Sequence, residues 1–181
     1  MKSEHQLRVE QFMNKAAQMA PGKQGVPDRP MVPSKEVRLL RAKLILEEAL
    51  ETVEALGFCV EDPDGGVVDK DYDVVPLWKW MGSKFLPVTD ADINLDEIAD
   101  GCADLSVVSI GTLSACGILD KPILECVDQN NLEKFGPGCT VSESGKLIKP
   151  PNHKPPNLKW VIANLRFWPF VQDHNDGCPN D

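Results

Sequence analysis

A long segment with helical periodicity, residues 38–56 (RLLRAKLILEEALETVEAL), most constrains what this chain can fold into. Its apolar residues recur at the spacing of an α-helix and fall on two stripes, one on each side of the helix. A helix that is apolar on both sides is normally buried. Glutamates interrupt one of these stripes, and a buried carboxylate is costly unless it is paired or bound to a cation.

The interrupting residues form the pattern EExxE, in which Glu48 and Glu51 lie on the apolar stripe and Glu47 lies on its flank. Two interpretations stay open for this pattern taken alone. It is either a metal site or a solvated acidic face with Lys43 or Arg41 as helical partners. Because such clusters are usually solvated, the metal site needs support from elsewhere in the chain.

A second acidic helix supplies that support. Residues 94–117 predict a helix that is capped by an Asn or Asp at its start and ends at a glycine. Its carboxylates fall within an arc of roughly 60° on an otherwise apolar stripe: Glu97, Asp100 and Asp104. Small residues on this helix would let a neighbouring helix approach closely: Gly101, Ala103, Gly111 and Ala115. Two acidic patches without a matching cationic stripe favour the metal site.

Carboxylates from two facing helices suit Mg²⁺, or Mn²⁺ as its substitute, because both are hard cations that prefer oxygen ligands. Helical di-iron sites need Glu-x-x-His pairs, and none of the three histidines lies on the acidic helices. The chain has neither a P-loop nor a GxGxxG motif. These exclusions leave magnesium-dependent chemistry on a phosphate substrate as the favoured function. The candidate phosphate contacts are Arg38, Arg41, Lys134, Lys146 and Lys149.

The composition limits which partners the protein is expected to bind. The 181 residues are enough for one domain with a sizeable core, and the net charge of −9 argues against a nucleic-acid-binding surface. No uncharged apolar run approaches the roughly 18 residues of a membrane span, and the N-terminal residues lack the apolar segment of a signal peptide. We therefore expect a cytoplasmic protein that binds neither nucleic acid nor membrane. All six cysteines are expected to be reduced.

The other segments predict shorter elements around the two acidic helices. Two further helices are expected at residues 3–20 and 120–134, and a short one begins near Leu158. Turn residues indicate a small hairpin within residues 58–75 and another around Ser144. Proline-rich stretches precede the first acidic helix and the last short helix, where they exclude regular structure.

An aromatic insertion separates the two acidic helices, over residues 58–95. It gathers Trp78, Trp80 and Phe85 within a few residues of one another. Loops of this length are often functional, so one of these rings, Trp80 above all, is a candidate to stack on a nucleotide base. The equally open alternative is an aromatic plug that covers the helices.

Three segments resemble the all-α nucleoside triphosphate pyrophosphohydrolases, the superfamily of MazG proteins, dimeric dUTPases and phosphoribosyl-ATP pyrophosphohydrolase. They are RLLRAKLILEEALE, DEIADGCADLSVVSIGTLSACGI and NNLEKFGPGCTVSESGKLIKPPNHKPPNL. The resemblance is closer to the MazG-like proteins of phages and bacteria and covers roughly residues 30–158. It implies an all-α helical bundle in a single domain, 1–181, encoded by a bacterium or by a phage within its host.

The resemblance also implies an activity and roles for the acidic residues. These enzymes hydrolyse nucleoside triphosphates to the monophosphate and pyrophosphate with Mg²⁺. Glu48 and Glu51 would be metal ligands, and Glu47 would bind metal or orient the attacking water. Relatives carry ExxD on the second helix, where the aspartate corresponds to Asp104 and the glutamate would fall at Gly101. That departure leaves two alignments open for the pair of metal ligands on the second helix. We favour Asp104 with Asp100, and the alternative is Asp100 with Glu97.

Outside the acidic helices, Asn131 and Lys134 match an Asn-x-x-Lys motif that would contact the triphosphate or the sugar. The resemblance also assigns a substrate contact to Lys146, on a weaker match. Relatives assemble as dimers or tetramers, so a homodimer or homotetramer is expected. Two other functions remain as alternatives: phosphoribosyl-ATP hydrolysis and a non-catalytic helical interaction module. The aromatic insertion and the KPPNHKPPNL segment disfavour the first, and the retained carboxylates disfavour the second. The sequence does not name the base.

Overall fold

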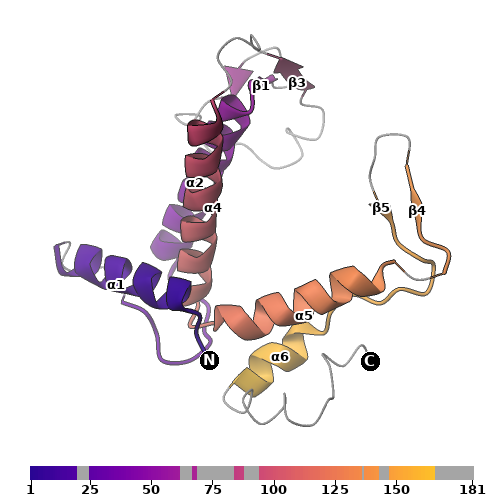
Figure 1. Ribbon diagram of the computed structural model, residues 1–181. Coiled ribbons are helices and arrows are strands. Elements are labelled where there is room, and N and C mark those ends of the chain that lie inside the picture. The colour runs from indigo at the N-terminus through magenta and orange to yellow at the C-terminus, as the bar shows by residue number, and fades with distance from the viewer. Residues whose placement is uncertain are drawn as a thin grey trace. The chain divides into compact units, whose positions relative to one another are not determined.

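The computed structural model describes residues 1–19, 25–61, 67–68, 84–87, 94–135, 137–142 and 147–165 (Figure 1). Over these residues the chain is mostly helical. The five helices within these ranges are α1 (Glu4–Met19), α2 (Lys35–Ala55), α4 (Leu95–Ala115), α5 (Asp120–Glu133) and α6 (Leu158–Asn164). The strands are short: β1 (Phe58–Glu61), β2 (Val67–Val68), β3 (Lys84–Pro87), β4 (Thr140–Val141) and β5 (Leu147–Ile148).

The chain divides into two compact units. One comprises Met1–Gln18, Gly25–Met31 and Leu113–Asp181, and the other comprises Met19–Gln24 and Val32–Thr112. The second unit holds α2, the three-stranded sheet and most of α4, and we call it the acidic-helix unit. The first holds α1, α5, α6, the two-stranded sheet and the end of α4, and we call it the terminal unit. The interpretation of the sequence as a single domain stays a prediction.

Local signals at the helix ends agree with the sequence. The Ser34 hydroxyl caps α2 by accepting a hydrogen bond from the Val37 amide at 3.3 Å. Asn94 caps α4 in the same way, since its side-chain oxygen accepts from the Asp96 amide at 2.9 Å. Gly57 follows α2 with φ 83°, a left-handed conformation that favours glycine.

Short sheets make the all-α prediction incomplete. In the acidic-helix unit β1 pairs with β2 and with β3, both antiparallel, in the order β2-β1-β3. The predicted hairpins are confirmed by the antiparallel pairs β1–β2 and β4–β5. Strand β3, which contains Phe85, was not predicted, because four residues of a segment rich in aromatic side chains give too short an alternation to identify a strand. Its pairing with β1 is non-local.

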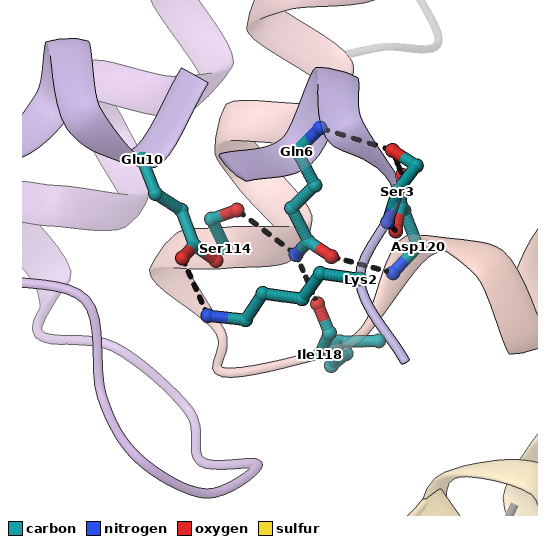
Figure 2. Close-up of polar contacts among 7 residues, drawn as sticks. All are labelled: Lys2, Ser3, Gln6, Glu10, Ser114, Ile118 and Asp120. Carbon is teal, nitrogen blue, oxygen red and sulfur yellow. Dashed lines mark hydrogen bonds and ion pairs between the residues drawn. The ribbon is translucent and has the colours of Figure 1, made fainter. Parts of the chain in front are cut away.

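A buried glutamine organises the terminal unit (Figure 2). Gln6 of α1 is fully buried, and its side-chain amide donates to the Ser114 hydroxyl at 3.0 Å and to the Ile118 carbonyl at 2.8 Å. Its side-chain oxygen accepts from the Asp120 backbone amide at 3.0 Å. One side chain therefore satisfies groups at the end of α4, in the turn and at the start of α5, which fixes α1 against this corner.

The Asp120 carboxylate completes the network. It accepts from the Ser3 amide at 2.9 Å, from the Ser3 hydroxyl and from the Lys121 amide at 2.7 Å. Ser3 in turn caps α1, because its hydroxyl accepts from the Gln6 amide at 3.0 Å. Residue type alone predicts Asp120 as the N-cap of α5, but Asp120 is the first residue of the helix and Leu119 is its N-cap.

The apolar residues of α1 at helical spacing, which include Leu7, Val9 and Phe12, predict its core face only in part. Val9 is buried, but Leu7 and Phe12 are 54% and 66% exposed. The buried face instead carries Gln6, Val9 and Glu10, two of which are polar. Hydrophobic periodicity could not find this face, because the hydrogen bonds of Gln6 and the ion pair from Lys2 to one oxygen of Glu10 allow polar side chains to be buried there.

The apolar core of the terminal unit lies between α5 and α6 and centres on Cys126, Val161 and Leu165. Cys126 is disulfide-bonded, so the expectation of six reduced cysteines is wrong at this position. The four other cysteines in the described ranges form no disulfide: Cys59, Cys102, Cys116 and Cys139. A buried Cys on an apolar helix face gives the same sequence pattern whether it is reduced or bonded.

By length and composition alone, α4 is apolar enough to cross a membrane, a test that the core helix of a soluble protein also passes. Asp100 and Asp104 lie within this helix, and an ionised carboxylate in a bilayer is costly. Only 28% of its apolar window is buried within the chain.

Replacing Gln6 by alanine should lower the free energy of unfolding by about 1–3 kcal/mol, because the Asp120 amide and the Ile118 carbonyl lose their buried partner. Urea denaturation followed by circular dichroism measures this change. The matched control is Gln11→Ala on the exposed part of the same helix, which should change stability little. Equal effects of the two variants would contradict the role assigned to Gln6.

Candidate active site

The acidic helices α2 and α4 lie side by side and antiparallel in the acidic-helix unit (Figure 1). Gly101 of α4 lies against Thr52 of α2, where a Cβ on Gly101 would be 2.7 Å from the threonine hydroxyl oxygen and 3.1 Å from its Cα. One turn away, the charges of Glu48 and Asp104 act on each other. Because position numbers fall along α2 as they rise along α4, the two helices run in opposite directions.

Negative charge gathers around Glu48. The pKa of its carboxyl is raised above the ordinary value, first because burial removes water from the charged form, and then because Asp104, Glu51, Glu47 and Asp100 repel it. Five of the six acidic residues that the sequence singled out thus take part in this repulsion. Among the four that act on Glu48, Asp104 raises its pKa most.

Glu97, the sixth acidic candidate, lies about one turn before Asp100 on α4. It is exposed in the first turn of α4 and is not among the charges that raise the pKa of Glu48. Asp100 and Asp104, one turn apart on α4, are the aspartates that act on Glu48. The choice between the two pairs of metal ligands stays a prediction, with Asp104 and Asp100 as the favoured pair.

The donor set fits a hard divalent cation. All five members are carboxylates on facing helices, and a cation would replace their mutual repulsion by attraction. As placed, no three His, Cys, Asp or Glu side chains within the described ranges are grouped at metal-binding distances. Glu47, Glu48 and Asp104 are half-buried, while Glu51 and Asp100 are exposed, so side-chain rotation about the helix surfaces would be part of binding.

The candidate substrate contacts are spread over both units. Arg41 lies on α2 two turns before Glu48 and so shares its face of the helix. Asn131 and Lys134 lie at the end of α5 in the terminal unit, where the Lys134 ammonium donates to the Asn131 side-chain oxygen at 2.5 Å. Lys146 and Trp80 lie outside the described residues.

Two residues that the sequence analysis did not single out have defined roles in the structure. Thr52 is buried, and its hydroxyl donates to the Glu48 carbonyl at 2.7 Å. Asn130 is buried next to the exposed Asn131, donates to the Lys154 carbonyl at 2.8 Å and contacts the His153 ring at 3.1 Å. It attaches the proline-rich segment to α5. In both cases the sequence signal that could have identified the residue was a polar side chain between apolar positions at helical spacing.

Comparison with known proteins agrees with this arrangement. A family model described as Phosphoribosyl-ATP pyrophosphohydrolase matches residues 22–131, more than half of the chain, including both acidic helices. This match shows that the chain is a member of the MazG-like superfamily of nucleoside triphosphate pyrophosphohydrolases, as the sequence predicted. Within it, the chain belongs to the phosphoribosyl-ATP pyrophosphohydrolase family, whose members are hydrolases of acid anhydrides. No curated protein matches the chain.

Replacing Glu48 by glutamine should stabilise the metal-free protein at pH 7. The folded-state pKa of Glu48 lies above its unfolded value of 4.5, so its contribution to stability is present below pH 4.5 and is lost as pH rises through the folded pKa. The gain from Glu48→Gln should therefore shrink toward zero at pH 4. Urea denaturation in EDTA at both pH values tests this expectation.

The control for that experiment is Glu54→Gln, an exposed position on the same helix. It should leave the stability difference between pH 4 and pH 7 close to that of the wild type. A destabilised Glu48→Gln variant at pH 7 would contradict the repulsion described around this carboxylate.

Proposed function

We propose that this chain is a Mg²⁺-dependent pyrophosphohydrolase that converts (deoxy)nucleoside triphosphates to the monophosphate and pyrophosphate. The observation that carries this proposal is the gathering of four carboxylates around Glu48 from two antiparallel helices. A triphosphate is itself highly anionic, so a site of this charge binds it only through cations. Membership of a pyrophosphohydrolase family supports the same reaction class.

In this proposal Glu48, Glu51, Asp100 and Asp104 hold Mg²⁺, which supplies positive charge to the phosphate oxygens. Glu47, half-buried beside Glu48, accepts the proton of the attacking water. The water oxygen bonds to the α-phosphorus, the bond from that phosphorus to the bridging oxygen breaks, and pyrophosphate leaves. The assigned cleavage position rests on the resemblance to the superfamily.

In this proposal the substrate is bound by side chains outside the group of carboxylates, and most of these side chains are positively charged. Arg41 is on the same face of α2 as Glu48, where its guanidinium would pair with phosphate. Lys134 and Asn131 would contact the triphosphate or sugar, and Lys146 and Trp80 remain candidates for phosphate and base. Of these, Asn131 is the last residue within the family match.

Phosphoribosyl-ATP is the second candidate substrate, and one observation favours it: the matched family model carries that name. Its hydrolysis breaks the same kind of phosphoanhydride bond, so the same carboxylates would serve. The two candidates differ in the group attached to the base, and a direct substrate comparison separates them.

We also propose that the protein acts as a homodimer or homotetramer in the cytoplasm of a bacterium or of a phage-infected host. Large apolar residues of α2 stay exposed within one chain, Leu39, Leu40 and Leu46 at 40–45%. A helix that is apolar on two sides needs a second surface to cover it. A second copy supplies an apolar face of the same kind, which fits a closed symmetric assembly.

Incubation with each nucleoside and deoxynucleoside triphosphate, and with phosphoribosyl-ATP, should give monophosphate and pyrophosphate in Mg²⁺ and neither in EDTA. Glu51→Gln and Asp104→Asn should each reduce turnover at least about a hundredfold, because metal sites are sensitive to single donor changes. Chromatographic separation of products measures both. Glu54→Gln serves as the matched control. Diphosphate and orthophosphate as products would overturn the assigned cleavage position.

Replacing Leu39 and Leu46 by glutamate should shift the protein toward the monomer, because these residues are one heptad apart on α2 and share a face. Size-exclusion chromatography with light scattering measures the mass of each species. Lys43→Glu, at an exposed position on the same helix, is the control for added negative charge. A wild-type protein that is already monomeric would contradict the proposed assembly.

A further inference from the structure

The two acidic helices lie tightly against each other at Thr52 and Gly101. A Cβ on Gly101 would meet the Thr52 hydroxyl oxygen at 2.7 Å, its Cα at 3.1 Å and its Cβ at 3.2 Å. The distance to the Thr52 hydroxyl oxygen is shorter than the contacts that Cβ atoms make in real structures. Because a backbone atom is almost as near as the side chain, rotation of Thr52 alone would not make room. Only a residue without a side chain fits at Gly101 with the helices at this spacing.

Thr52 is itself held in place. Its hydroxyl donates to the Glu48 carbonyl at 2.7 Å, and the residue is 6% exposed. A β-branched side chain has few χ1 positions on a helix, and this hydrogen bond selects among them. The surface that faces Gly101 is therefore a fixed one, so the contact behaves as a stop that sets how closely α2 and α4 approach.

This stop lies one turn from the centre of the acidic site. Glu48 precedes Thr52 by one turn on α2, and Asp104 follows Gly101 by one turn on α4. Their charges act on each other across the two helices. A Mg²⁺ ion demands ligand oxygens at about 2.0–2.1 Å, so the spacing of the two helices limits which side-chain rotations bring both carboxylates to one ion.

We infer that Thr52 and Gly101 are positioning residues that set the spacing between the two sets of carboxylates and thereby the divalent-cation affinity of the site. This inference rests on the proposed function. Neither residue contributes a ligand. The contact also leaves no space for a glutamate at position 101, so α4 offers the cation its aspartates alone.

The test is divalent-cation binding by the full chain, with Mn²⁺ as the probe, measured by calorimetry well below the melting temperature of each variant. Gly101→Ala should weaken Mn²⁺ binding by about tenfold and raise the Mg²⁺ concentration for half-maximal turnover by a similar factor. Cys102→Ala, a small-residue change at the neighbouring exposed position, should match the wild type in both respects. Unchanged Mn²⁺ affinity in Gly101→Ala would overturn the inference.

A second substitution on the other helix separates spacing from general destabilisation. Thr52→Ala in the Gly101→Ala background removes the atom at 2.7 Å and should restore part of the Mn²⁺ affinity, although it also removes a buried hydrogen bond. Failure of this double variant to bind Mn²⁺ more tightly than Gly101→Ala would overturn the assignment to this contact.

Two variants of Thr52 keep the test decisive if Gly101→Ala does not fold. Thr52→Val preserves the shape of the side chain and should bind Mn²⁺ within about twofold of the wild type, whereas the larger Thr52→Leu should weaken binding by about tenfold. Equal affinities of these two variants would overturn the inference. A wild-type chain that binds no Mn²⁺ would overturn the proposed function and the inference together, which distinguishes that failure from a failure of the inference alone.

Discussion

Repulsion among carboxylates is the interaction on which the acidic site depends. Glu48 is partly shielded from water and faces like charges from its own helix and from α4, so burial and repulsion both disfavour its ionised form. A protein that keeps such an arrangement loses stability in the metal-free state. A divalent cation reverses the sign of this interaction, which links folding, metal binding and phosphate chemistry in one place.

The helix pair holds these charges at close range through contacts that carry no charge. Thr52 and Gly101 lie tightly against each other, and the hydroxyl of Thr52 donates to the carbonyl of Glu48, the residue that bears the central carboxylate. The terminal unit follows a similar principle with different groups, since the fully buried Gln6 satisfies polar groups from three segments (Figure 2). In both units, small polar contacts determine the packing of helices.

Much of this arrangement could be predicted from the sequence, because helices, their caps and their acidic stripes are encoded by local spacing. The capping of α2 by Ser34 and the left-handed Gly57 after it follow from residue type alone. Strand β3 and the buried face of α1 could not be predicted, since each depends on partners distant in the sequence. The role of Thr52 in the helix contact could not be predicted either, because a threonine within a helix gives no sign of such a contact until the opposing glycine is known.

Manganese-induced broadening of carboxyl resonances in NMR spectra tests the central claim most directly, because it locates the cation without relying on turnover. The account predicts that Mn²⁺ broadens the side-chain carboxyl signals of Glu48 and Asp104 first and that an excess of Mg²⁺ restores them. The signal of Asp120, which is already engaged by Ser3 and Lys121, should persist. Broadening of Asp120 with sharp signals for Glu48 and Asp104 would contradict the account.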